Sequence, residues 1–157
     1  MKELVVAILD FIFKRRSVVP VDPRLGGVEA PLAPCGTITI HEASSILLDK
    51  LDELNDPSAE IFLPDADIKV YRKSDVEKSK GIKEVSALHY VAETHDCDDF
   101  AAILFGLFAG LVWTNVHALN WFIDENSTFW WIEPQTGVMS RTLDTWQGYE
   151  VRFFVGR

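Results

Sequence analysis

The sequence has few cysteines, no long uninterrupted apolar segment and no excess of basic residues. Cys35 and Cys97 are its only cysteines, so a disulfide framework is excluded and a single bridge between them is the one pairing left open. The net charge of -9 disfavours binding to a phosphate backbone, so no nucleic-acid partner is expected. The apolar run 4–13 is interrupted by Asp10, and no cleavage site follows it. We therefore expect a cytoplasmic protein with no transmembrane segment.

The chain is long enough for one domain with a core, because 48% of its 157 residues are hydrophobic. We expect an N-terminal helix followed by an arm rich in proline and glycine over 1–36, and a single catalytic domain over 37–157. In this domain, 37–55 is predicted to be a strand leading into a helix, with short extended pieces at 61–65 and 68–71. Ser74 and Glu77 have the spacing of a capping box that opens a further helix, and 149–155 is predicted to be a strand.

Cys97 lies at a predicted helix start, with Asp96 or Thr94 as the capping residue. Unpaired amide groups and the positive end of the helix dipole favour a thiolate in a first turn. The segment that follows is apolar on nearly all sides as far as Val112, which predicts a central buried helix.

His117 and Glu133 lie on two predicted strands, 114–123 and 129–132, joined as an antiparallel hairpin. A three-residue loop at 124–126 sets His117 directly opposite Glu133, with Cβ atoms about 4.5–5.5 Å apart. A slip of one residue would separate them. A cysteine followed by a histidine and a carboxylate is the layout of a thiol nucleophile, its base and the group that orients the base.

Two alternatives use other histidines. His95 is a rival base, but residues two apart do not face each other on a helix. A zinc site from His89, His95 and Cys97 is a second alternative, which lacks the paired cysteines or the H-E-x-x-H segment typical of such sites.

Residues 61–137 resemble a known family. The motifs are F-L-P-D at 62–65, Y-V-A-E at 90–93, D-C-D-D-F-A at 96–101, H-A-L-N at 117–120 and I-E-P-Q-T-G at 132–137. They are similar to the papain-like cysteine protease domain at the C-terminus of the Marasmius oreades agglutinin and its bacterial and phage relatives. The resemblance implies an α+β, papain-like (transglutaminase-like) fold, with the nucleophile helix packed on an antiparallel sheet. It also implies that Cys97 is the nucleophile, His117 the general base and Glu133 the orienting group.

The predicted function is therefore that of a cysteine-dependent hydrolase, a thiol protease that cleaves amide bonds in a peptide, protein or cell-wall peptide substrate through a Cys-His-Glu catalytic triad. One alternative is a non-catalytic binding or assembly module. Another is a cell-wall amidase or a transglutaminase-like acyl transferase. The pattern indicates no oligomeric state.

Further site residues are predicted around this triad. The amide of Cys97 is one oxyanion donor, and Tyr90 or Thr94 is the second, because no glutamine precedes Cys97. Gln135 and Trp131 are predicted to contact the substrate.

The resemblance also implies calcium-dependent activity, with Asp98 and Asp99 as metal ligands. A bound cation would offset the cluster of acidic residues around a thiolate. The alternative is that Asp98 and Asp99 only complement the helix N-terminus.

Overall fold

The computed structural model describes residues 31–92, 95–143 and 150–157. The predicted N-terminal helix, most of the arm at 1–36, and Thr94 lie outside the described residues.

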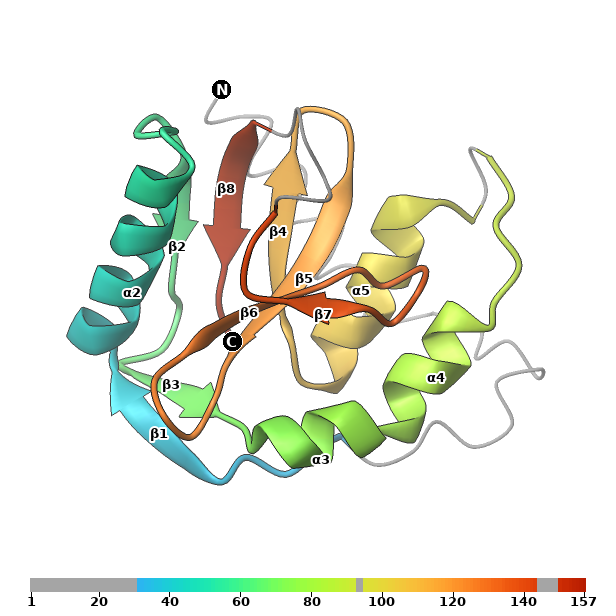
Figure 1. The fold of residues 1–157 in the computed structure, drawn as a ribbon, viewed down its shortest axis with the longest axis horizontal. Helices are drawn as coiled ribbons and strands as arrows, with labels where there is room; N and C mark the ends of the chain where they lie inside the picture. Colours follow the sequence, from blue (N-terminus) through green and yellow to red (C-terminus); the bar gives the residue numbers. More distant parts are fainter. Residues whose placement is uncertain (1–30, 93–94, 144–149) are drawn as a thin grey trace.

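The main sheet has six strands in the order β2–β8–β4–β5–β6–β7 (Figure 1). Their bounds are Glu60–Phe62, Val151–Val155, Gly110–Thr114, Ala118–Ile123, Phe129–Ile132 and Met139–Ser140. The sheet is mixed, because β2 runs parallel to β8 while the other neighbours are antiparallel. A separate two-stranded sheet pairs β1 (Gly36–Thr39) with β3 (Asp67–Val70). The predicted α+β class is confirmed, although an antiparallel sheet was expected.

Helices cover both faces of this sheet (Figure 1). Helix α2 (Ile40–Glu53) packs on one face, where it meets alternate residues of β5 such as Leu119 and Trp121. Helices α3 (Lys73–Lys78), α4 (Lys80–Ser86) and α5 (Cys97–Leu107) contribute to the opposite core, which contains Phe122. This alternation is the two-residue period of a strand buried on both sides.

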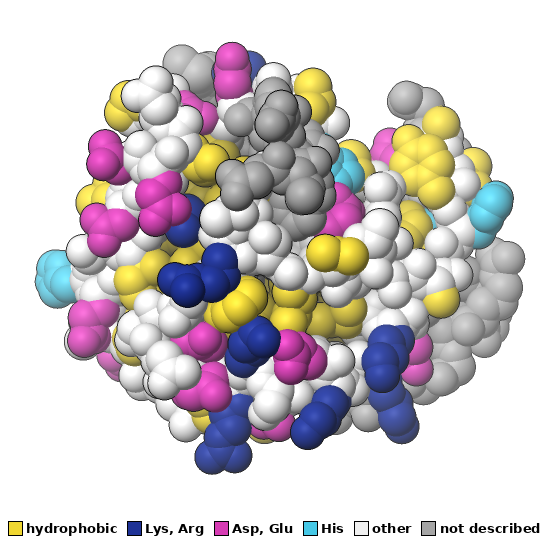
Figure 2. All heavy atoms as spheres, viewed as in Figure 1, with side chains coloured by type: hydrophobic (Ala, Val, Ile, Leu, Met, Phe, Trp, Pro, Cys, Tyr) yellow, Lys and Arg dark blue, Asp and Glu magenta, His cyan; other side chains and the backbone are white. Residues whose placement is uncertain are grey.

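Figure 2 shows several basic side chains along the lower edge, over α3 and α4, and others farther up the same face. Acidic side chains are most numerous on the side of α2. No helix among the described residues is both long and apolar enough to cross a bilayer.

The two helix starts expected before Cys97 differ in their outcome. Helix α2 begins after Thr39, which forms a capping box with Glu42. The capping box predicted at Ser74 is wrong, because α3 begins at Lys73 and has no side-chain cap. The Lys73 amide instead donates to the Glu125 carboxylate, 2.8 Å away, a partner distant in sequence that no local spacing predicts.

Helix α5 is shorter than predicted. It ends at Leu107, and the chain re-enters the sheet as β4 at Gly110, where a helix was expected as far as Val112. A helix and a strand that are both buried have equally apolar sequences, so hydropathy did not reveal the change. The backbone of Gly110 lies directly against the ring of Trp121, which leaves no room for a side chain. Glycine at this position therefore lets β4 pack beside that ring.

The hairpin loop is longer than predicted. Ile123 pairs with Phe129, and residues 124–128 connect the strands. The Asp124 carboxylate organises this loop by accepting hydrogen bonds from the amides of Asn126 and Thr128 and from Nε1 of Trp130. Burial raises the pKa of Asp124, but the hydrogen bonds from these donors lower it by more than burial raises it. The net result is a pKa below the ordinary value for an aspartate. The register is shifted by two residues, which keeps every side chain on its predicted face.

We expect Gly110→Ala to destabilise the protein by about 1–3 kcal/mol, because the added methyl group would overlap the buried Trp121 ring. Gly106→Ala is the matched control, since a Cβ there meets nothing within 4 Å in helix α5. That control is expected to be stabilising by roughly 0.5–1 kcal/mol. Urea unfolding of both variants measures the difference, and equal midpoints would contradict the packing described.

Candidate functional site

Cys97 is the first residue of α5, as predicted. Asp96 is the N-cap and forms a reciprocal capping box with Asp99, whose carboxylate accepts the Asp96 amide at 3.4 Å. The Cys97 side chain packs beside a buried cluster that includes Ala118 and Phe153. Both Cys35 and Cys97 are free thiols, so the bridge left open by the sequence is not formed.

His117 precedes β5 and contacts Glu133, the residue that follows β6. The ring Nε2 lies 2.8 Å from Oε2 of Glu133, and these side chains are only 13% and 10% exposed. In the observed register Glu133 is a diagonal neighbour of His117, where a directly opposed pair was predicted. Diagonal partners on one face remain within reach of long side chains, so the two-residue shift preserved the contact.

The side chain of Cys97 also acts on the His117 ring. Burial lowers the pKa of His117, but hydrogen bonds to the side chains of Cys97 and Glu133 outweigh burial and raise it to about 9. Because Nε2 faces Glu133, the other ring nitrogen is left for Cys97. The three side chains therefore form one row, in which the imidazole of His117 lies between the Cys97 side chain and the Glu133 carboxylate.

The turn after β6 is built around Glu133. Its Oε1 accepts the amide of Gln135 at 3.1 Å, and its backbone carbonyl accepts the amides of Thr136 and Gly137. Gly137 has a φ of 72°, a conformation that glycine adopts without a steric penalty. The carboxylate that holds His117 thus also fixes the loop of Gln135.

A hollow of about 340 Å³ is lined by Leu88, Tyr90, Phe100 and Gln135. Two of these residues are tied to members of the row, because Phe100 lies one turn after Cys97 in α5 and Gln135 donates its amide to the Glu133 carboxylate. Tyr90 and Gln135, two of the predicted ligand contacts, therefore come together here.

Trp131 does not join them. Its side chain is 0% exposed and packs on Phe129 and Phe154 in the core. The contact with substrate predicted for Trp131 is therefore wrong. Strand alternation shows that Trp130 and Trp131 face opposite ways, but both faces of this sheet are covered.

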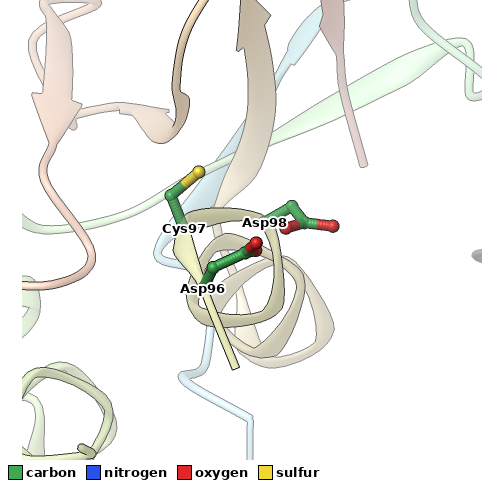
Figure 3. Close-up of side chains that lie close together, drawn as sticks. All are labelled: Asp96, Cys97 and Asp98. Atoms are coloured by element: carbon green, nitrogen blue, oxygen red, sulfur yellow. The ribbon is translucent and has the colours of Figure 1, made fainter. Parts of the chain in front are cut away.

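Asp96, Cys97 and Asp98 form the one cluster among the described residues with the proximity expected of metal ligands, within 4.8 Å of one another. In Figure 3 the Asp96 and Asp98 carboxylates lie together, and the Cys97 side chain extends to another side of the helix start. Burial, followed by the hydrogen bond and charge of Asp96, raises the pKa of Asp98 to about 6. Asp99, the other predicted ligand, is engaged in the helix cap.

The donor set fits calcium incompletely. Calcium takes six to eight oxygen ligands, whereas this cluster brings two carboxylates and a thiol sulfur. Calcium dependence therefore stays a prediction. His89 and His95 are absent from the cluster in the described part of the chain, which gives the zinc alternative no support. The His95 ring instead packs on Phe100, with ring centroids 4.9 Å apart.

Asn120 is a positioning residue that the sequence analysis missed. It is fully buried, and its side-chain amide donates to the carbonyls of Ala101 in α5 at 2.9 Å and of Gly110 in β4 at 3.0 Å. It thereby ties the helix that begins at Cys97 to the strands that flank His117. A lone amide within the apolar run of β5 was the available signal, because a buried polar group needs partners.

No protein-family model and no curated protein matches this chain. Among solved structures, one described as a PSL1a-E64 complex matches with a TM-score of 0.58 and 23% identity, covering 76% of this chain and 50% of that chain. A structure of Polyporus squamosus lectin bound to the human-type influenza-binding epitope Neu5Aca2-6Galb1-4GlcNAc matches with a TM-score of 0.57 and 22% identity, over 76% and 49% of the two chains. The matched part is thus about half the length of those chains, and the likeness shows the fold.

These matches correct the functional prediction. They fit the agglutinin part of the resemblance, since the similar structures are those of a fungal lectin. They do not support its papain-like protease part, and the prediction that the chain is a papain-like cysteine peptidase is wrong by this comparison. The alternative of a binding module agrees better with these neighbours, each of which is described with a bound ligand.

The raised pKa of His117 makes stability depend on pH. Its folded pKa of about 9 exceeds the ordinary 6.5, so its interactions stabilise the fold fully below about pH 6.5, and that contribution is lost as pH rises through 9. Glu133→Gln removes the charged acceptor of the His117 ring. We therefore expect this variant to lose less stability than the wild type as the pH rises from about 6.5 to 9.

Urea unfolding near pH 6 and above pH 9 measures this dependence. Glu150→Gln is the control, because the Glu150 side chain is 70% exposed and its ion pair with Arg152 is long, at 3.8 Å. A Glu133→Gln variant with the full wild-type pH dependence would show that Glu133 does not hold the charge on His117.

Proposed function

We propose that this chain is a ligand-binding module whose site is the row Cys97–His117–Glu133 together with the adjoining hollow. The observation that carries the proposal is the contact of the buried His117 ring with the Glu133 carboxylate, which also holds the amide of Gln135, a residue that lines the hollow. Both similar structures are described with a bound ligand, E64 in one and a sialylated trisaccharide epitope in the other, which supports a binding role.

The row favours a thiol-reactive ligand. A neighbouring imidazolium stabilises a thiolate, and E64 is an epoxide that reacts with thiolates. In such a reaction a C–S bond forms at Cys97, the C–O bond of the epoxide opens, and the oxygen takes a proton from His117. Tyr90 and Phe100 supply an apolar wall for the rest of the ligand, and Gln135 supplies a polar group.

A carbohydrate is the second candidate ligand. Tyr90 lines the hollow and is 51% exposed, and a tyrosine ring presents an apolar face with a polar tip. The adjacent Gln135 side chain offers both hydrogen-bond donors and acceptors. A glycan bound in this way requires no reaction at Cys97, so the two ligand classes are separable by experiment.

The intact mass of the protein after incubation with E64 tests the proposal. We expect one adduct on the wild type and on Cys35→Ser, and none on Cys97→Ser. Cys35 is the matched control because it is the only other cysteine in the sequence, is exposed, and directs its Sγ to the carbonyl of Val70. Titration with the trisaccharide Neu5Aca2-6Galb1-4GlcNAc, followed by NMR shifts of Tyr90, tests the second candidate.

Two results would overturn the proposal. One is an adduct confined to Cys35, with no shift on adding the trisaccharide. The other is turnover: cleavage of casein or of a peptidoglycan peptide that disappears in Cys97→Ala would exclude a module that only binds.

A further inference from the structure

The turn between β4 and β5 is organised by one hydroxyl group. Thr114 ends β4 and is 2% exposed, and its Oγ1 donates to the carbonyl of His117 at 2.7 Å. The same oxygen accepts the amides of His117 at 2.8 Å and of Val116 at 3.3 Å. The Thr114 amide also donates to the His117 carbonyl, at 2.9 Å. One donor and two acceptor positions are all that a hydroxyl offers, and all of them serve this turn.

His117 needs this support because it lies outside the strand ladder. The paired residues of β5 begin at Ala118, and the paired residues of β6 end at Ile132, so no strand pair fixes the backbone at His117. Its ring nevertheless meets Glu133 at 2.8 Å, a distance that a small backbone rotation would break. The position of the ring therefore depends on the turn, and the turn depends on Thr114.

We propose that Thr114 is the positioning residue of the site, and that its hydroxyl holds the His117 ring in contact with both Glu133 and Cys97. This inference deepens the proposed function and rests on it, since it concerns the same row. Thr114 touches no ligand in this account and acts only through the backbone of His117.

Thr114→Val removes the hydroxyl while keeping the branched shape, and Thr114→Ser keeps the hydroxyl. In Thr114→Val we expect the pKa of His117, followed by NMR titration of its ring, to fall from about 9 toward 6.5. We also expect the rate of E64 labelling at Cys97 at pH 7 to drop about fourfold, because an imidazole with a pKa near 9 is almost fully protonated at that pH, whereas one with a pKa of 6.5 is mostly neutral. Thr114→Ser restores both values. Thr114→Ala provides the same comparison should the valine variant not fold.

Asn115→Ala is the matched structural control. Its Oδ1 accepts the amide of Glu150 at 3.1 Å, so this variant also removes a hydrogen bond from the turn, but one that does not involve His117. We expect Asn115→Ala to lower the urea midpoint while leaving the pKa of His117 near 9. A folded Thr114→Val or Thr114→Ala protein with an unchanged His117 titration would overturn the proposal, as would an equal fall of the pKa in Asn115→Ala. The titration needs no ligand, so failure of the wild type to bind both E64 and the trisaccharide would refute the proposed function and leave this test intact.

Discussion

The carboxylate of Glu133 is the interaction on which the site depends. One oxygen holds the ring of His117, and the other holds the amide of Gln135. The Glu133 side chain is only 10% exposed, and a hydrogen bond to a charged group is worth more in such surroundings than at the surface. Loss of this one carboxylate would therefore release the imidazole on one side and the wall of the hollow on the other.

All three members of the row lie at the ends of regular elements. Cys97 opens α5, His117 precedes β5, and Glu133 follows β6. Helix and strand hydrogen bonds do not fix such positions, so the chain uses local polar contacts, namely the Asp96 cap and the Thr114 turn. The aromatic core holds the helix and strands in place, and these polar contacts set the positions of the three side chains at their ends.

Features that depend on local residue patterns could be predicted from the sequence. The cap before Cys97 and the face shared by His117 and Glu133 follow from spacing, and the face survived a loop two residues longer than expected because strand alternation repeats every two residues. The loop length was not predictable, since it follows from three hydrogen bonds to Asp124. Hydropathy did not locate the end of α5 or show that Trp131 is buried, because both faces of the sheet are covered. Function was least predictable, since one fold supports many functions.

The most direct test is a crystal structure of the protein treated with E64. We expect E64 to be joined to the sulfur of Cys97, with its remaining atoms between Tyr90 and Gln135 and with the His117 ring still in contact with Glu133. E64 attached at Cys35, or a Cys97 adduct directed away from that hollow with His117 turned from Glu133, would contradict it.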